Sequence, residues 1–283
     1  MRGLSRQRRG PTAARTVRLL STMTRERPAL PVIVLAAIAV AFFVIPIAGL
    51  LYRAPWATAL AELTRPEALD AFRLSVFVSI VATVLAIIFG VPLAWIYARV
   101  PFPGRDVVRA FTTLPMILPP IVGGVALLFA FGRSGLVGQF LDAGFGLRIA
   151  FTTTGAVLAA AFVATPFLVL TVEAGLRSMD RRYEEAARTL GATRWHVFRR
   201  VTLPLIAPSL FAGAVLAWAR GLGEFGATIT FAGNLPGTTQ TLPLAVLIAL
   251  ETRPEVAVML SLLLLAISLV ILIALRDRYL RFS

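Results

Sequence analysis

The stretch Leu74–Ala98, LSVFVSIVATVLAIIFGVPLAWIYA, decides the fold class, because it runs for 25 residues without a charged side chain. About 20 apolar residues are enough to cross about 30 Å of hydrocarbon as a helix. The whole chain of 283 residues is 58% hydrophobic and 15% charged, with a mean hydropathy of +0.84. Soluble domains use roughly 45 to 50% apolar residues. The sequence therefore predicts an all-α integral membrane protein.

Further apolar runs on both sides of this stretch complete a set of six predicted membrane spans. The polar segments between them are short, so we expect residues 31–281 to form one transmembrane domain. We expect the preceding basic tail, residues 1–30, to be a disordered cytoplasmic segment. An additional apolar run, residues 242–250, is too short to cross and predicts a re-entrant or surface helix. The six predicted spans cover residues 31–51, 74–98, 110–131, 153–176, 203–221 and 256–275.

The basic residues orient the predicted bundle. The net charge is +14, and all 28 basic residues are arginine. Of these, 21 lie in the two termini and in the loops 99–109 and 177–200, whereas six lie in the alternate loops. Positive loops favour the cytoplasmic side, so we expect both termini and the long basic loop in the cytoplasm. A cleaved secretory signal is the alternative at the N-terminus, but an apolar core of about 20 residues favours an uncleaved span.

Missing residue types exclude several chemistries. Without cysteine the chain has no disulfide and no thiolate ligand or nucleophile. Without lysine it cannot form the G-x-x-x-x-G-K-[ST] loop that binds ATP phosphates, so any ATP must be hydrolysed by another chain. The single histidine, His196, cannot supply a multi-histidine metal site. We therefore expect no cofactor or metal on this chain and no catalytic residue, and we read its basic loops as topology signals rather than as a nucleic-acid surface.

The loop over residues 177–204 is the most informative polar segment. Asp180 can begin a short helix, and Gly191 is suited to the left-handed position that ends one. Thr193 can begin a second short helix, which we expect to end before Pro204. The sequence therefore predicts two short helices joined by a sharp turn, with small and apolar side chains open to another surface.

The same loop resembles the E-A-A-x3-G-x9-I-x-L-P signature of bacterial ABC-importer permeases, with Val201 in place of isoleucine as the one departure. An ordinary basic loop that only sets topology is the alternative interpretation. The resemblance implies the six-helix type I permease fold, in which this loop is a coupling helix. It also implies partners: a dimer of ATP-hydrolysing subunits that carries ATP and magnesium, a second permease chain and an extracytoplasmic solute-binding protein. The residues that it assigns to ATPase coupling are Glu185, Ala186, Ala187, Leu190, Gly191, Val201, Leu203 and Pro204.

A glycine-rich stretch at the end of the fifth predicted span carries a pair of charges. Arg220 and Glu224 are four residues apart, hence on one helix face, and charges at membrane depth are costly unless they are paired or face water. We keep two interpretations open, a position in the solute pathway and an internal structural ion pair. Glu173 and Arg177 form a similar pair nearer the membrane surface, which we expect to be structural. The provisional pathway or gate residues are Arg220, Gly223, Glu224, Phe225 and Gly226.

The solute class is suggested by the same stretch. Gly-Glu-Phe-Gly at 223–226, followed by Gly-Asn-Leu-Pro-Gly at 233–237, resembles molybdate permeases and more loosely sulfate and thiosulfate permeases. Phe225 favours molybdate, because the sulfate relatives tend to have tyrosine there; tungstate is not distinguished. The resemblance favours a homodimer, although the sequence leaves a heterodimer open. The prolines and glycines of residues 114–124 predict a kinked helix beside the pathway.

Two other classes of function remain as alternatives. An ion-coupled secondary transporter or channel needs titratable groups inside the membrane, and the sequence offers only Glu224 and Glu173. A membrane-embedded enzyme needs a cluster of catalytic side chains, for which the sequence offers little. An ATP-driven importer subunit is therefore the favoured hypothesis.

Overall fold

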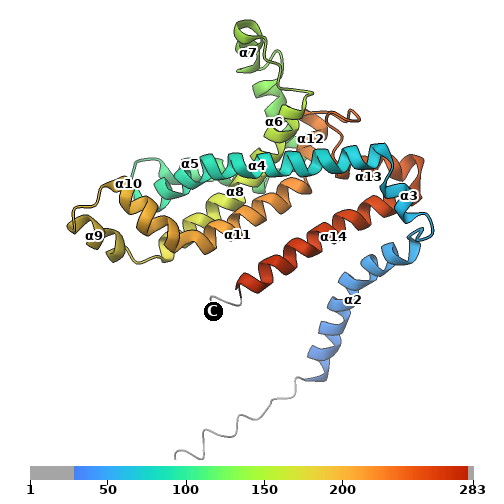
Figure 1. Ribbon diagram of the computed structural model, residues 1–283, viewed down its shortest axis with the longest axis horizontal. Helices are drawn as coiled ribbons and strands as arrows, with labels where there is room; N and C mark the ends of the chain where they lie inside the picture. The colour runs from blue at the N-terminus through green and yellow to red at the C-terminus, as the bar shows by residue number, and fades with distance from the viewer. Residues whose placement is uncertain (1–28, 280–283) are drawn as a thin grey trace, which may run out of the picture. The chain divides into compact units, whose positions relative to one another are not determined.

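A computed structural model describes residues 29–279, with side chains as far as Ile273 (Figure 1). Most of these residues are helical, and none of them lies in a β-strand. The predicted disordered tail, residues 1–30, falls almost wholly outside the described residues. The helices are α2 (Leu30–Arg53), α3 (Ala59–Leu63), α4 (Pro66–Arg99), α5 (Arg105–Thr113), the 3-10 turn η1 (Leu114–Met116), α6 (Pro120–Phe131), α7 (Gly138–Phe145), α8 (Thr153–Ser178), α9 (Arg182–Thr189), α10 (Arg194–Val197), the π-helical turn η2 (Phe198–Thr202), α11 (Leu203–Leu222), α12 (Gly226–Phe231), α13 (Leu242–Thr252) and α14 (Pro254–Tyr279).

The predicted membrane spans correspond to long apolar helices. Five helical stretches in the described part of the chain are long and apolar enough to cross a membrane, and the bent pair of α5–η1 with α6 makes a sixth if it counts as one span. As expected, α13 is an apolar helix of 11 residues, shorter than a span. The five stretches are Leu30–Arg53, Pro66–Arg99, Thr153–Ser178, Arg194–Leu222 and Pro254–Ile273.

The third predicted span is bent rather than straight. The helical stretches Arg105–Met116 and Pro120–Phe131 meet at an angle of 116°. Pro115 lies in η1 and Pro120 begins α6, and a proline has no backbone N–H with which to continue a helix. The predicted kink is therefore confirmed, and Figure 1 shows α5 and α6 running in different directions.

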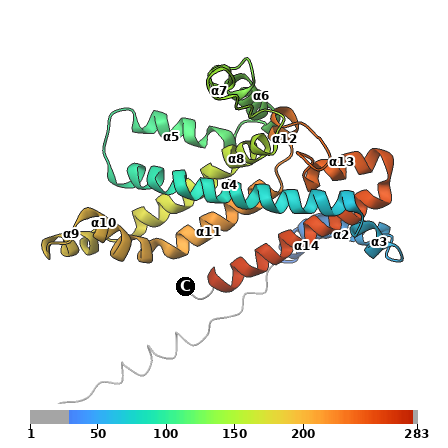
Figure 2. The same ribbon diagram turned by 45° about the horizontal axis from the view of Figure 1, so that its top comes forward.

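Helices α4, α8 and α11 form the core of the bundle and lie side by side in Figures 1 and 2. The face of α8 toward this core is rich in alanine, and Ala156, Ala160 and Ala164 are fully buried there. Small side chains let membrane helices approach closely and gain van der Waals contact. This packing matters because helices surrounded by lipid are not driven together by the hydrophobic effect. Tyr97 at the end of α4 is the largest fully buried side chain and packs in the same cluster as Leu176.

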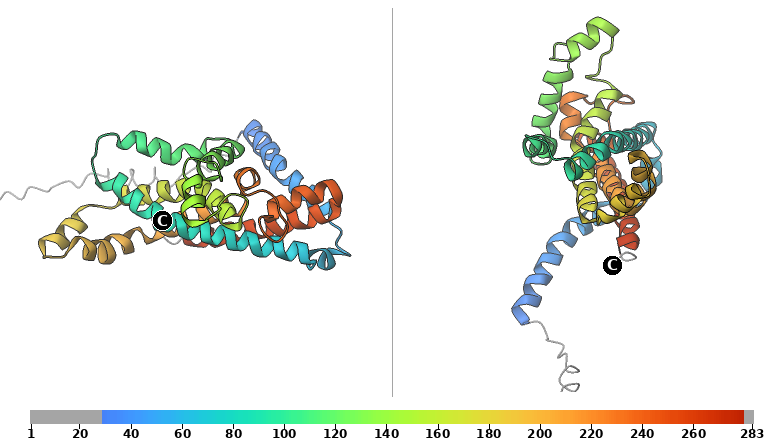
Figure 3. Two further views of the ribbon diagram at one scale, coloured as in Figure 1. Left: turned by 90° about the horizontal axis from the view of Figure 1, so that it is seen from above. Right: turned by 90° about the vertical axis from the view of Figure 1, so that its left-hand side faces the viewer.

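Polar side chains connect these helices across the bundle. Ser79 on α4 accepts a hydrogen bond from the indole N–H of Trp218 on α11, with an N–O distance of 2.9 Å. Ser75, one turn earlier, accepts from the backbone N–H of Leu242 at the start of α13 at 2.6 Å. The α13–α14 hairpin thereby meets the first half of α4, as the left view in Figure 3 also shows.

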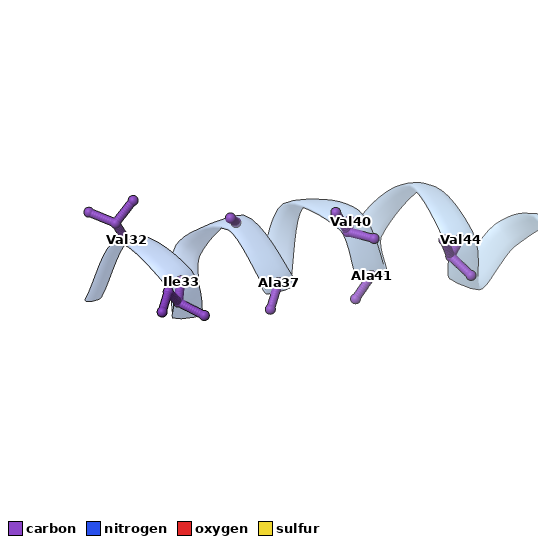
Figure 4. A pocket seen from close by; sticks show the side chains of 7 residues that line it. Val32, Ile33, Ala37, Val40, Ala41 and Val44 are labelled. Carbon is purple, nitrogen blue, oxygen red and sulfur yellow. The ribbon is translucent and has the colours of Figure 1, made fainter. Parts of the chain in front are cut away.

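The described residues as far as Gly49, most of α2, belong to one unit of the chain, and the described residues from Leu50 onward belong to a second. None of the residues of α2 is buried. Figure 4 shows one face of this helix, which carries only valine, isoleucine and alanine side chains, so that every side-chain atom drawn is carbon. An apolar surface all round a helix suits a membrane environment.

Candidate functional site

The predicted coupling loop folds as two short helices, α9 and α10, around a sharp turn. The carboxylate of Asp180 accepts a hydrogen bond from the backbone N–H of Arg182 at 2.9 Å, where α9 begins. Gly191 ends this helix with φ of +85°, a conformation that L side chains rarely adopt. The hydroxyl of Thr193 then accepts from the N–H of His196 and caps α10. These local predictions are confirmed.

The predicted end of the second short helix is wrong. We expected it to stop before Pro204, but α10 passes through the π-helical turn η2 directly into α11. The wider turn immediately precedes Pro204, whose missing N–H removes one regular helical hydrogen bond in any case. The fifth span is thus a continuous helical stretch, Arg194–Leu222, that begins inside the coupling loop.

Several of the predicted coupling residues share one exposed surface. Leu190 is 89% exposed, and Trp195 is 69% exposed and stacks on Phe198. Glu185 and Ala186 are also exposed on α9. Four predicted residues meet at an open hollow of about 520 Å³, whereas Leu203 and Pro204 lie at the start of α11. The hollow is lined by Ala187, Leu190, Gly191, Ala192, Thr193, His196, Arg200 and Val201.

Sequence reasoning missed the buried side of α9. Glu184 is 6% exposed although Glu185 beside it faces outward. Its carboxylate lies 3.2 Å from the Nε of Arg99, the last residue of α4, and accepts a hydrogen bond of 2.7 Å from the hydroxyl of Thr202. The sequence carries no local signal for this burial, because adjacent residues of a helix lie about 100° apart and both can face water.

A second buried carboxylate lies deeper in the same end of the bundle. Glu173 on α8 is 1% exposed and pairs with Arg177 at 2.7 Å, as its spacing predicted. It also pairs with Arg109 of α5 at 3.2 Å, which the spacing could not indicate. A buried carboxylate needs compensating charge, and of its two arginine partners Arg109 is the one that joins α5 to the end of α8.

The predicted pathway residues form a break between α11 and α12. Helix α11 ends at Leu222, and Glu224 follows it with 2% exposure. Its carboxylate lies 2.6 Å from a guanidinium nitrogen of Arg220 and accepts a hydrogen bond of 2.8 Å from the N–H of Ala227 in α12. Gly223 is exposed and Phe225 is half-buried. The predicted ion pair is confirmed, although the helix ends between its two members, and the role of the pair in a pathway remains a prediction.

Close backbone contact holds this break against α6. A Cβ atom at Gly226 would come within 2.8 Å of the Pro120 side chain and 3.1 Å of the Ile121 nitrogen. A Cβ at Gly124 would lie 2.7 Å from Thr230. The two glycines therefore let α12 lie directly on the helix that follows the 116° bend.

A fourth paired carboxylate lies outside the predicted spans. Asp142 on α7 accepts hydrogen bonds from Arg148 at 3.0 Å and from Arg133 at 2.9 Å. These hydrogen bonds, first that from Arg148, hold the pKa of the Asp142 carboxyl below its ordinary value of 3.8. Within residues 29–279 no three His, Asp or Glu side chains are grouped so that they could hold a metal ion.

Comparison with known proteins places this arrangement in a family. Residues 86–281 match the family described as the inner membrane component of binding-protein-dependent transport systems. The molybdenum transport system permease protein ModB of Mycobacterium tuberculosis is 45% identical over 84% of this chain and 90% of its own length. ModB of Escherichia coli is 46% identical over 67% of this chain and 82% of its own. The sulfate transport system permease protein CysT of Salmonella typhimurium is 38% identical over 81% of this chain and 82% of its own length.

Solved structures show the same fold. The chain is similar to one from a bacterial ABC transporter involved in the import of the acidic polysaccharide alginate, with a TM-score of 0.67, 19% identity, and 90% of this chain and 96% of that chain covered. A second similar structure also has a TM-score of 0.67, with 18% identity, and the match covers 89% of this chain and 94% of that chain. It is a bacterial alginate ABC transporter in complex with an alginate pentasaccharide-bound periplasmic protein. The family match over residues 86–281 includes the coupling loop and the helix break. This chain is therefore a multi-pass inner membrane protein that belongs to the binding-protein-dependent transport family, the permease subunits of ABC importers.

Proposed function

We propose that this permease subunit moves molybdate across the bacterial cytoplasmic membrane, driven by ATP that a separate chain hydrolyses. The choice of molybdate as the substrate rests on sequence identity. The chain is 45 to 46% identical to molybdenum permeases and 38% identical to a sulfate permease. Phe225 at the helix break supports the same choice. Sulfate, thiosulfate and tungstate are alternative solutes, because they too are tetrahedral dianions.

The orientation that we propose places both termini and the α9–α10 turn in the cytoplasm. Arginine is concentrated in the loops on that side, and positive residues near span ends favour the cytoplasmic face. The opposite face then carries α7 and the loop between α12 and α13. That face is where an extracytoplasmic solute-binding protein would deliver its cargo, as a periplasmic protein is bound in the alginate transporter structure.

The partner that we propose for α9 and α10 is a dimer of ATPase subunits. The exposed Leu190 and Trp195 and the adjoining hollow offer an apolar, concave surface of the kind that binds another protein. Because the chain has no lysine, it cannot carry the phosphate-binding loop itself, and ATP and magnesium belong to the partner. We further propose that two copies of this chain form the pathway.

The helix break is the proposed pathway lining. A dianion that leaves water needs a positive field or hydrogen-bond donors. Arg220 retains 28% exposure of its side chain while Glu224 has 1%, so the guanidinium is the member of the pair that can reach an aqueous path. Its positive charge is largely balanced by Glu224, which suits a site that passes an anion on rather than retaining it.

The test is uptake by the reconstituted complex in liposomes, with the ATPase, the binding protein and labelled molybdate. We expect ATP-dependent uptake that tungstate inhibits strongly and sulfate weakly. Stronger inhibition by sulfate than by tungstate would overturn the choice of molybdate, and uptake by this chain without the ATPase would overturn the ATP-driven mechanism.

A matched pair of variants tests the coupling turn in the same assay. Gly191→Val and Gly104→Val each place a branched side chain at a left-handed position with open space around it, at φ of +85° and +79°. Each change strains its turn by about 1 to 2 kcal/mol. We expect only Gly191→Val to lose the stimulation of ATP hydrolysis by loaded binding protein. Equal loss in both variants would contradict a coupling role for the α9–α10 turn.

A further inference from the structure

Polar contacts connect the C-terminal end of α4 to the segment 177–184, which leads from α8 into the coupling helices α9 and α10. The last backbone carbonyls of a helix lack partners within the helix, and arginine side chains near them also interact favourably with the helix dipole. Two arginines of this segment donate hydrogen bonds to backbone carbonyls in the last turn of α4. A glutamate of α9 forms an ion pair with the side chain of the last residue of α4. The three contacts are Arg177 Nη2 to Tyr97 O at 3.5 Å, Arg181 Nη2 to Ala98 O at 3.0 Å, and Arg99 Nε to Glu184 Oε2 at 3.2 Å.

The contact between Arg99 and Glu184 is the buried one. Both side chains are only 8% exposed. The Nε and Nη2 atoms of Arg99 are buried without a hydrogen bond. The carboxylate of Glu184 therefore balances the buried positive charge of Arg99. Removing one partner of such a pair leaves an uncompensated buried charge, which proteins tolerate poorly. Glu184 therefore fixes the position of α9 relative to the end of α4.

Glu184 also binds the start of the fifth span. Its second carboxylate oxygen accepts the hydroxyl hydrogen of Thr202 at 2.7 Å. Thr202 lies in η2, a π-helical turn, and such turns are frequent at functional sites. One carboxylate thus joins three elements, namely α9, α4 and the entry to α11. Along the chain itself, α9 is continuous only with α8 and α10.

We propose that Glu184 is a positioning residue for energy coupling, which transmits displacement of α9 to α4 through Arg99 and to α11 through Thr202. This inference rests on the proposed function, in which an ATPase subunit displaces α9 and α10. It differs from the signature of the family, because the signature glutamate is Glu185, which is exposed. The exposed residue is placed to meet the ATPase, and the buried one to pass the displacement to the spans.

The test uses the complete complex in liposomes and measures solute taken up per ATP hydrolysed, with binding protein loaded with molybdate, tungstate or sulfate in separate arms. Glu184→Gln keeps an acceptor for Thr202 and removes the charge that faces Arg99. We expect uptake per ATP to fall about fivefold or more, the low end of typical coupling effects. The matched control is Asp106→Asn, the same chemical change in an arginine-paired carboxylate of α5 that is 86% exposed, for which we expect an unchanged ratio.

A double variant separates coupling from folding. Arg99→Met with Glu184→Gln leaves no lone buried charge, so we expect it to regain the thermal stability that Glu184→Gln loses, while uptake per ATP stays low. If uptake per ATP returns together with stability, or if Glu184→Gln matches the wild type, Glu184 only stabilises the fold and the inference is overturned. A wild-type complex that imports none of the three oxyanions overturns the proposed function instead.

Discussion

Glu184 and Glu224 are both buried and both paired with an arginine, but their partners come from different distances along the chain. Arg220 and Ala227, the partners of Glu224, lie within four residues of it. The partners of Glu184 are Arg99, 85 residues earlier, and Thr202, 18 residues later. The carboxylate with local partners shapes one helix break, whereas the carboxylate with distant partners fixes three elements relative to one another.

The largest effect that we expect from breaking either pair is on stability. Arg220→Met leaves Glu224 buried without a countercharge and should lower the free energy of unfolding by about 3 to 5 kcal/mol. Arg99→Met should cost a similar amount, because Glu184 is also deeply buried. Chemical unfolding in detergent, followed by circular dichroism, measures both changes.

A neutral pair is the control for this prediction. Arg220→Met combined with Glu224→Gln removes both charges and keeps an acceptor for the Ala227 N–H, so most of the lost stability should return. The outcome that contradicts the prediction is a loss below about 1 kcal/mol for Arg220→Met, the size of an ordinary surface effect. It would mean that water reaches Glu224.

The same difference in distance explains which site residues could be predicted from the sequence. A spacing of four residues places two side chains on one helix face, so the pairs at 220 and 224 and at 173 and 177 follow from the sequence alone. The left-handed Gly191 and the cap by Thr193 are local in the same sense. The pair of Arg99 with Glu184 depends on how α4 packs beside the coupling segment, and no local pattern encodes that packing.

The fold divides in the same way. Apolar runs of span length predicted where the long helices lie, because the thickness of the membrane sets their length. The prolines of residues 114–124 predicted a kink but not its angle of 116°, which depends on the contact of α6 with α12. The continuation of α10 into α11 was mispredicted, because a π-helical turn lets the helix pass the proline that was expected to end it.

A smaller effect is expected from overpacking the helix break around Glu224. Gly226→Ala places a Cβ atom 2.8 Å from the Pro120 side chain and 3.1 Å from a backbone nitrogen, so α6 and α12 must move apart. We expect a loss of about 1 to 3 kcal/mol in the free energy of unfolding and reduced uptake. This result would show that the break depends on contact with α6 as well as on its local ion pair.

The matched control for this change lies three residues away. At Gly223 an added Cβ meets only a backbone oxygen, at 3.7 Å, and the residue is exposed. Gly223→Ala should therefore leave stability within about 0.5 kcal/mol of the wild type. If the two variants lose equal stability, the close approach of α12 to α6 is not what holds the break.

The smallest effect is expected at Asp142, which has two arginine partners but little shielding from water. Arg133 and Arg148 are 72% and 62% exposed, so solvent and salt screen their attraction to the carboxylate. Their hydrogen bonds lower the pKa of Asp142 in the folded protein, so its stabilising contribution is present above pH 3.8 and is lost as the pH falls through the lowered value. Asp142→Asn should therefore reduce the unfolding temperature slightly at neutral pH, less so in high salt, and not at all below that lowered pKa. A reduction as large as that of Arg220→Met would show that the number of arginine partners, rather than burial, decides how much a carboxylate stabilises this protein.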